Sequence, residues 1–316
     1  MNFGSTMRAI SQQELGGADV LEVVTKERPK PRANEILVRV HAASLNPTDW
    51  KHRATGGFLG SPPFALGWDL SGTVEGVGVG VARFVPGDEV FGMLTYPFGH
   101  GAHAEYVSAP ARFFARKPVE VDHVQAGALP LASLTAWQAL VEYANVQQGQ
   151  RVLIHAAAGG VGHLAVQIAK ALGAYVIGTA SEPKHEFLRS IGADETIDYR
   201  STDFAEVLSD IDVVLDTIGE EVSMGSLRVL RPGGIVVSIR PTGPREFYDE
   251  ADRLGVRALR MLVDSSEHNM REIAELVSAG KLRATIAQSF PFTEAADAHR
   301  LGETNRTVGK IVLTMV

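Results

Sequence analysis

The chain has 316 residues, of which 45% are hydrophobic and 21% charged, which is typical of a folded protein of about two domains. The 37 acidic residues outnumber the 30 Lys and Arg and give a net charge of −7, which disfavours nucleic acid or an anionic membrane as partner and favours small molecules. The absence of cysteine excludes disulfides, thiolate nucleophiles and Cys-ligated zinc.

The first third of the chain predicts short β-strands. Residues 35–42 alternate apolar and polar side chains, as a strand with one buried face does. Further strand-like segments cover residues 71–77, 89–93 and 104–108, with a Pro-Gly-Asp turn at 86–88. Short strands with frequent Gly and Pro favour a barrel-like all-β unit.

From about Leu134 the pattern changes to apolar strands that alternate with segments of helical length. This alternation is typical of βαβ units on a parallel sheet. The strands are expected at residues 151–157, 175–180, 195–199, 212–216 and 234–239, followed by helices at 267–279 and 293–301 and a last strand at 310–315.

Two further patterns bear on location. The residues before Met7 are neutral and lack the apolar core of a signal peptide. The uncharged stretch 126–141 contains Gly, Pro, Ser, Thr and Gln, so it favours buried structure over a membrane span. We therefore expect a cytoplasmic protein.

A glycine cluster follows the first strand of the alternating part. Residues 152–162 form an apolar run that enters a glycine turn, and apolar residues then recur at helical spacing from Val161 to Leu172. A strand, a glycine turn and a helix suit a dinucleotide, because the helix N-terminus directs free N–H groups at the phosphates. The alternative is a packing turn, which the four further strands disfavour. The candidate cofactor-binding residues here are Ala157, Gly159, Gly160, Val161 and Gly162.

The choice of nicotinamide cofactor depends on the end of the second strand. An acidic residue there holds the ribose hydroxyls of the non-phosphorylated cofactor and repels a 2′-phosphate. Here the strand ends at Ala180 and Ser181, and the first acid is Glu182. Ser181 and Lys184 suit a phosphate, so the sequence favours NADPH, although Lys184 also fits a solvated helix residue.

These motifs, in this order, resemble the medium-chain dehydrogenase/reductase superfamily, specifically its zinc-independent, zeta-crystallin-like quinone oxidoreductase branch. The resemblance rests on residues 156–162, 188–194, 198–200 and 231–234 after a β-rich start, and it extends from Met7 to Val316. It implies an α/β fold with a Rossmann-like, doubly wound parallel sheet at residues 125–264. A GroES-like β-rich catalytic domain would comprise residues 1–124 and be completed by the return segment 265–316.

The zinc-dependent members of this superfamily carry a catalytic Cys and a Gly-His-Glu motif. This chain has Asn46 and Gly67-Trp68-Asp69 at those places, and an indole cannot ligate zinc. No metal site is expected, and metal-assisted alcohol oxidation is disfavoured. Quinones and α,β-unsaturated carbonyls accept a hydride without a metal, because hydrogen bonds stabilise the oxygen that gains charge. The resemblance implies NADPH-dependent reduction of such compounds.

Three candidate catalytic residues follow from the resemblance. It implies that Asn46 lies beside the nicotinamide and the substrate, and that Thr135 lies under the nicotinamide. The alternatives are an Asn-Pro turn residue and a helix N-cap. Lys51 stands where many quinone reductases carry Tyr and some relatives carry Lys. Its ammonium suits a developing oxyanion, and the alternative is a surface cation paired with Asp49.

The resemblance implies further contacts around the cofactor. Tyr199 is expected near the adenine, with a core aromatic as the alternative. Ile218 and Ile239 complete the candidate cofactor-binding residues. His100 or His103 fits either a proton relay or a structural histidine. Residues 256–263 read as an edge strand, and the resemblance implies a homodimer through it.

Two other functions remain open at this point. One is an enoyl reductase of a biosynthetic pathway, which uses the same hydride chemistry with a longer pocket. The other is an NADPH-binding protein with little turnover, which the lack of a strong acid–base constellation favours. Hydride transfer to an electrophilic acceptor, however, needs mainly positioning.

Overall fold

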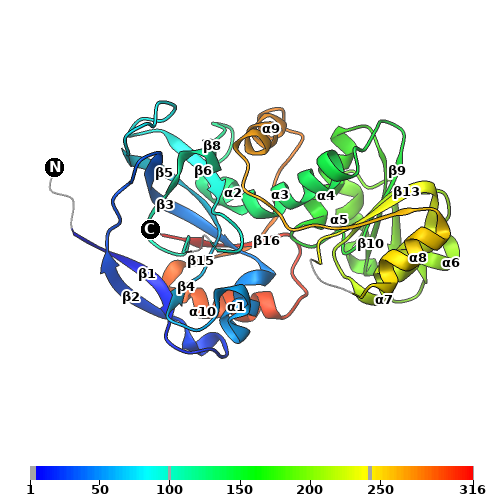
Figure 1. Cartoon of the computed structure of the whole chain (residues 1–316), viewed down its shortest axis with the longest axis horizontal. Helices are drawn as coiled ribbons and strands as arrows, with labels where there is room; N and C mark the ends of the chain where they lie inside the picture. Colours follow the sequence, from blue (N-terminus) through cyan, green and yellow to red (C-terminus); the bar gives the residue numbers. More distant parts are fainter. Residues whose placement is uncertain (1–4, 99–100, 241–243, 316) are drawn as a thin grey trace. The chain divides into compact units, whose positions relative to one another are not determined.

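The computed structural model describes residues 5–98, 101–240 and 244–315, which form two compact units (Figure 1). Unit 1 comprises Met1–Leu134 and Asp264–Val316, and unit 2 comprises Thr135–Val263. Unit 2 is therefore an insertion into unit 1, whose first and last segments fold together.

Unit 2 is built on a six-stranded parallel sheet with the order β11-β10-β9-β12-β13-β14. The strands are β9 (Arg151–Ile154), β10 (Tyr175–Ala180), β11 (Glu195–Asp198), β12 (Ile211–Asp216), β13 (Leu230–Ser238) and β14 (Arg257–Arg260). The strand order reverses between β9 and β12, the kind of switch point at which open parallel sheets bind ligands.

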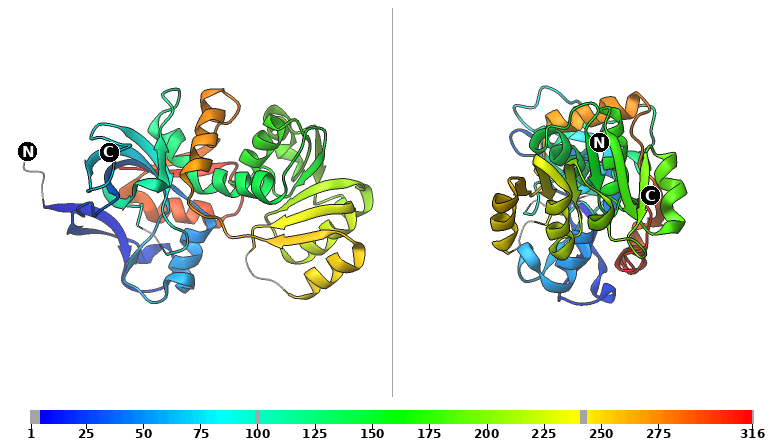
Figure 2. Two further views of the ribbon diagram at one scale, coloured as in Figure 1. Left: turned by 45° about the horizontal axis from the view of Figure 1, so that its top comes forward. Right: turned by 90° about the vertical axis from the view of Figure 1, so that its right-hand side faces the viewer.

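Helices cover both faces of this sheet (Figure 2). They are α4 (Gly162–Ala171), α5 (His185–Ser190), α6 (Phe204–Val207), α7 (Glu220–Val229) and α8 (Glu246–Leu254), and a π-helical segment at Gln138–Tyr143 precedes the sheet. Leu153, Val214 and Val236 are fully buried, as continuous apolar strands between two helical layers should be.

The strands expected in the alternating part are confirmed, with small differences at their ends. The first was expected over 151–157 but ends at Ile154, because the chain turns at Ala156, whose φ of 46° is incompatible with a strand. The edge strand expected over 256–263 is shorter, at Arg257–Arg260, and does lie at the edge of the sheet.

Unit 1 contains a seven-stranded and a three-stranded sheet. The larger has the order β15-β16-β3-β5-β6-β8, with β7 paired to β3, and the smaller has the order β2-β1-β4. The strands are β1 (Thr6–Gln12), β2 (Glu22–Glu27), β3 (Glu35–Leu45), β4 (Phe64–Ala65), β5 (Asp69–Val77), β6 (Glu89–Met93), β7 (Tyr106–Pro110), β8 (Phe114–Arg116), β15 (Ile286–Pro291) and β16 (Lys310–Thr314). The return segment thus places β16 between β15 and β3.

Helices α2 (His123–Ala128), α9 (Glu267–Ser278) and α10 (Ala295–Glu303) belong to unit 1, and α3 (Pro130–Trp137) begins in it. The expected strand at 104–108 lies two residues later, as β7. Helix α1 (Pro47–Thr55) was not expected, although its start carries clear signals. Asn46 is the N-cap, Pro47 is the first helical residue, and Asp49 completes a capping box.

Candidate active site

The candidate cofactor-binding residues all follow the carboxyl ends of strands in unit 2. Residues 157–162 follow β9, Ser181 and Lys184 follow β10, Tyr199 follows β11, Ile218 follows β12, and Ile239 follows β13. Because the strands are parallel, these ends share one edge of the sheet, the edge at which such sheets bind ligands.

The glycine turn is shaped by close backbone packing. A Cβ on Gly162 would lie 2.4 Å from the carbonyl oxygen of Ala156 and 2.7 Å from the Cα of Ala157, so only glycine lets α4 start against this turn. Ala156 has a left-handed φ of 46°, and the Thr179 side chain accepts a hydrogen bond from its N–H at 3.2 Å. The turn thus presents a helix N-terminus, and these residues fit the pyrophosphate of a dinucleotide.

The polar candidates lie together at one side of this edge. Ala180 and Asp198 are paired across β10 and β11, so Ser181 and Tyr199 follow partnered residues. Ser181 is buried, whereas Tyr199 is 59% exposed, which contradicts the core-aromatic alternative. The guanidinium carbon of Arg200 lies 5.9 Å from the centroid of the Tyr199 ring, which adds a cation that the sequence had not singled out.

The loop after β12 is fixed by buried polar groups. The Asp216 carboxylate accepts hydrogen bonds from the N–H groups of Ile218 and Gly219, both at 2.9 Å. Thr217 donates to the carbonyl oxygen of His155 at 2.9 Å. Burial lowers the pKa of His155 to about 4, so its imidazole is neutral at pH 7. Ile218 remains 47% exposed at the switch point.

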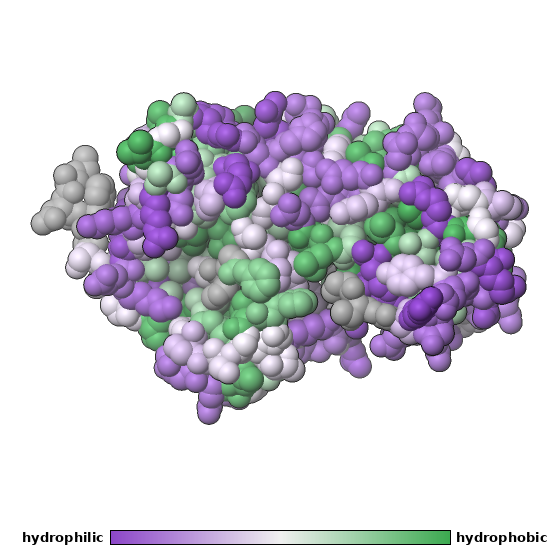
Figure 3. Space-filling view, in the orientation of Figure 1, coloured by the Kyte–Doolittle hydropathy of each residue, from purple (hydrophilic) through white to green (hydrophobic). Residues whose placement is uncertain are grey.

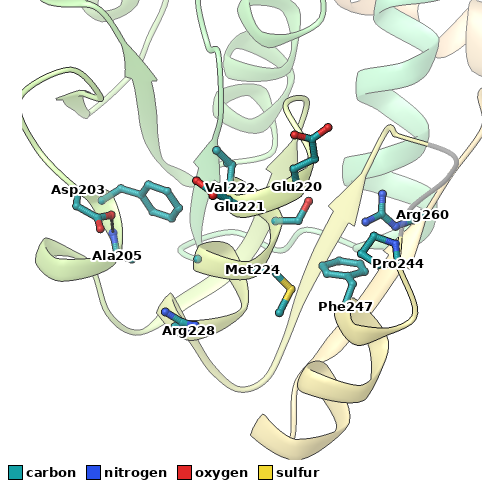
Figure 4. Close-up of a pocket in the computed structure, with 13 residues that line it drawn as sticks. Asp203, Ala205, Glu220, Glu221, Val222, Met224, Arg228, Pro244, Phe247 and Arg260 are labelled. Carbon is teal, nitrogen blue, oxygen red and sulfur yellow. Dashed lines mark hydrogen bonds between the residues drawn. The ribbon is translucent and has the colours of Figure 1, made fainter.

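A separate cavity of about 630 Å³ lies among α6, α7 and α8 (Figure 4). Phe204, Met224 and Phe247 line it together with Arg260 and Glu220. None of the candidate cofactor-binding residues lines this cavity, so it is distinct from the glycine turn.

In unit 1, Asn46 joins the end of β3 to the start of α1. The Asp49 carboxylate accepts a hydrogen bond from the Asn46 N–H at 2.7 Å, and another from the Gly67 N–H at 2.9 Å. Asn46 is only 3% exposed. The residue therefore starts a helix and also directs its carboxamide into a buried polar cluster.

That cluster contains two more charged residues, each the first residue of a strand. Asp69 opens β5 and accepts from Ser44 Oγ at 2.6 Å and from Asn46 Nδ2 at 2.8 Å. Lys310 opens β16 and donates to the carbonyl oxygen of Leu45 at 3.0 Å and to Asn46 Oδ1. The Lys310 Nζ and Asp69 Oδ2 atoms are 3.6 Å apart. We call Asn46, Asp49, Asp69 and Lys310 the buried charge cluster.

Burial shifts the titration of the cluster. Burial lowers the pKa of Lys310, although both aspartates oppose this effect. Burial raises the pKa of Asp49 to about 7, and the Asp69 charge adds to the rise. Asp69 was identified from the sequence only as part of a replaced zinc motif, and Lys310 was not identified as a site residue. The available signal was a lysine at the start of the mostly apolar strand 310–315.

Thr135 and Lys51 lie in different settings. Thr135 is 4% exposed in the interior of α3, so the N-cap alternative for it is wrong. It lies one helical turn after Leu131, whose N–H donates to Asp69 Oδ1 at 2.5 Å. Lys51 is exposed on α1, while the Asp49 carboxylate is buried and bonded to backbone N–H groups.

Of the two histidines considered as proton relays, the structure describes only His103. His103 is fully buried, and burial lowers its pKa to about 4, which favours a neutral structural ring. His100 lies outside the described residues. A different polar chain is present nearby, where Thr48 Oγ1 lies 2.9 Å from Tyr96 Oη and 3.0 Å from His52 Nδ1.

No group of three or more His, Cys, Asp or Glu side chains within the described residues is placed to hold a metal ion. None of the helices in residues 5–98, 101–240 and 244–315 combines the length and apolar character that a membrane crossing requires.

Comparison with known proteins identifies the family. Residues 32–119 match the alcohol dehydrogenase GroES-like domain, and residues 191–313 match a family described as zinc-binding dehydrogenase. A chloroplast envelope quinone oxidoreductase homolog of Arabidopsis thaliana is 33% identical over 98% of this chain and 99% of its own. An NADPH-dependent alkenal/one oxidoreductase of the same plant is 34% identical over 97% of this chain and 79% of its own.

Solved structures agree with this assignment. The quinone oxidoreductase of Coxiella burnetii superposes with a TM-score of 0.93 at 38% identity, covering 98% of this chain and 100% of that one. The Escherichia coli quinone oxidoreductase complexed with NADPH gives a TM-score of 0.88 at 29% identity, covering 97% of this chain and 99% of that one. The fold and the site define an oxidoreductase with a nicotinamide-type cofactor site. The chain belongs to the quinone oxidoreductase branch of the medium-chain dehydrogenase/reductase superfamily.

Proposed function

We propose that this protein transfers a hydride from NADPH to a quinone or an α,β-unsaturated carbonyl, without zinc. The observation that carries the proposal is the combination of a dinucleotide-type glycine turn with Asn46 and Trp68 at the positions of zinc ligands in metal-dependent relatives. The family match named after zinc binding covers residues 191–313 and therefore contains neither position.

The candidate cofactor-binding residues contact different parts of NADPH along the carboxyl ends of the parallel strands. The N–H groups at the start of α4, with Gly159, Gly160, Val161 and Gly162, bind the pyrophosphate. Ser181, Lys184 and the exposed Arg200 suit the 2′-phosphate, with Tyr199 against the adenine. Ala157, Ile218 and Ile239 supply apolar contacts. NADPH itself supplies the hydride when bound.

The remaining candidates act on the acceptor and on the nicotinamide. Asn46 donates a hydrogen bond to the acceptor oxygen, which gains negative charge as the hydride arrives at carbon. Thr135 orients the nicotinamide, and Lys51 holds its ammonium where it stabilises the reduced oxygen before protonation. Because a quinone or enone is already electrophilic, positioning supplies most of the rate enhancement and no Lewis acid is needed.

The decisive experiment is the initial rate of NADPH oxidation with a panel of quinones and short enones, with a chelator present throughout and NADH in parallel. We expect NADPH-selective turnover that survives chelation. Loss of turnover on chelation would contradict the zinc-free mechanism. Tight NADPH binding without reduction of any acceptor would instead favour a biosynthetic enoyl substrate or a binding role.

The assembly and location of the protein remain predictions. We propose a homodimer formed through β14, because this strand is one of the two edge strands of the six-stranded sheet and the neighbouring Leu262 is 40% exposed. Sedimentation of the purified chain tests this. The cytoplasmic location also stays a prediction, since the Arabidopsis relatives named above carry chloroplast names.

A further inference from the structure

The Asn46 carboxamide lies between two opposite charges inside unit 1. Its Oδ1 accepts from the Lys310 ammonium, and its Nδ2 donates to the Asp69 carboxylate at 2.8 Å. Rotation of the amide by 180° would direct its N–H groups at the ammonium and its oxygen at the carboxylate. Both contacts would then be repulsive, so the two charges select one orientation of the amide.

The selected orientation determines what Asn46 can offer a ligand. Oδ1 is occupied by Lys310 and lies in the capping box with Asp49, whereas Asp69 uses only one of the two hydrogens on Nδ2. The second hydrogen on Nδ2 is the part of the carboxamide that this cluster does not use. Asn46 is therefore fixed as a hydrogen-bond donor, the role that a developing oxyanion requires.

We infer that Lys310 is a positioning residue, which with Asp69 locks the Asn46 carboxamide as the donor to the acceptor oxygen. This inference rests on the proposed function. Lys310 itself is 3% exposed, and its ammonium is directed at Leu45, Asn46 and Asp69. It therefore acts through Asn46, without contact to the acceptor.

The test is a double-mutant cycle on the full chain. We expect Lys310→Met to lower kcat with a quinone by about 10- to 100-fold, as the loss of an orienting partner does, with the KM for NADPH unchanged. In the Asn46→Ala background, the same change should cost nothing further, because the donor that Lys310 orients is already gone. A loss that carries over undiminished into that background would overturn the inference.

A matched control separates this effect from general damage. Lys117 is also a buried lysine of unit 1, and its Nζ donates to the carbonyl oxygens of Pro118 at 3.0 Å and Val121 at 2.6 Å. Lys117→Met should leave kcat unchanged. If Lys310→Met does not fold, Lys310→Leu also removes the donor to Asn46 Oδ1, and the cycle is repeated with it.

A second readout does not depend on turnover. The side-chain amide of Asn46 gives a pair of ¹H–¹⁵N resonances, assigned by their loss in Asn46→Ala. We expect this pair to move strongly in Lys310→Met and to stay in place in Lys117→Met. An unmoved pair would overturn the lock even if the protein reduces no quinone, whereas failure of the wild type to reduce any acceptor would count against the proposed function alone.

Discussion

The two units present their candidate ligand-binding groups in opposite ways. Unit 2 uses mainly backbone, since most of its candidate cofactor-binding residues lie in the glycine turn or directly after strand ends. The main side-chain requirement is a glycine at position 162, where the start of α4 packs against the backbone of the turn. Unit 1 uses buried polar and charged side chains that come from distant segments, with Asn46 and Lys310 separated by 264 residues. A binding edge made of backbone is local in sequence, whereas a buried charge cluster depends on the complete fold.

The largest expected effect is on the cluster. Asp69→Ala leaves the buried Lys310 ammonium without its carboxylate, and breaking a buried pair in this way costs about 3–5 kcal/mol of unfolding free energy. Urea denaturation measures the loss. Asp297→Ala is the control, because Asp297 pairs with Arg300 on the surface, where such pairs contribute at most about 1 kcal/mol. Equal losses of unfolding free energy in the two variants would contradict the larger stabilising effect expected of the buried pair.

Acid should destabilise both units, because each contains a buried histidine whose pKa is lowered by burial. The unfolded chain binds a proton on His103 as the pH falls below the ordinary pKa of 6.5, whereas burial delays this in the folded protein to about 4. The stability that His103 contributes is thus complete above pH 6.5 and is lost as the pH falls towards 4, by up to about 3 kcal/mol.

Urea unfolding at several pH values measures this dependence. His103→Gln in unit 1 and His155→Gln in unit 2 should each make the decline between pH 6.5 and pH 4 shallower. His268→Gln, on the exposed surface of α9, should leave the decline as it is in the wild type. The idea fails if the three variants decline alike.

A third variant tests the backbone character of unit 2. Gly162→Ala forces a Cβ to within 2.4 Å of the Ala156 carbonyl oxygen, whereas the Cβ of Gly159→Ala would meet the same atom at 3.2 Å. We expect the first change to cost about 2 kcal/mol of stability and to weaken NADPH binding. The second should cost much less. Thermal unfolding and NADPH fluorescence titration measure both effects, and similar results for the two glycines would contradict the packing argument.

The smallest expected effect concerns cofactor choice. Ser181→Asp places a carboxylate at the end of β10, where it repels a 2′-phosphate and holds ribose hydroxyls. The preference for NADPH over NADH should fall about tenfold, or about 1.4 kcal/mol. Ser209→Asp, in the exposed loop before β12 at the other edge of the sheet, should leave the preference unchanged. An unchanged preference in Ser181→Asp would exclude this strand end from phosphate recognition.

The sequence predicted unit 2, whose features are local, more completely than unit 1, whose site depends on distant segments. The alternation of strands and helices after Leu134 predicted five of the six strands of the parallel sheet, and residues 256–263 were interpreted separately as its edge strand, since apolar periodicity is a local property. The sequence pattern did not predict the turn at Ala156, because an alanine does not indicate a left-handed backbone conformation.

In unit 1, Asn46 was found through the family resemblance, whereas the roles of Asp69 and Lys310 were not. Nothing near Asp69 in the sequence indicates that β16 will bring a lysine to it. Helix α1 was missed for another reason. Its capping signals at Asn46, Pro47 and Asp49 were present, but Asn46-Pro47 was considered only as a possible turn and Asp49 only as a possible partner of Lys51.

The position of Lys310 also bears on how the chain is made. A ribosome releases β3 and β5, with Asn46 and Asp69, long before it releases β16. Unit 2 is complete in the nascent chain while unit 1 still lacks Lys310, the counter-charge of Asp69, and β16, the strand that pairs with the end of β3. Unit 2, which carries the candidate nucleotide site, is therefore free to fold first during synthesis, and unit 1, with the buried charge cluster, is the last to form.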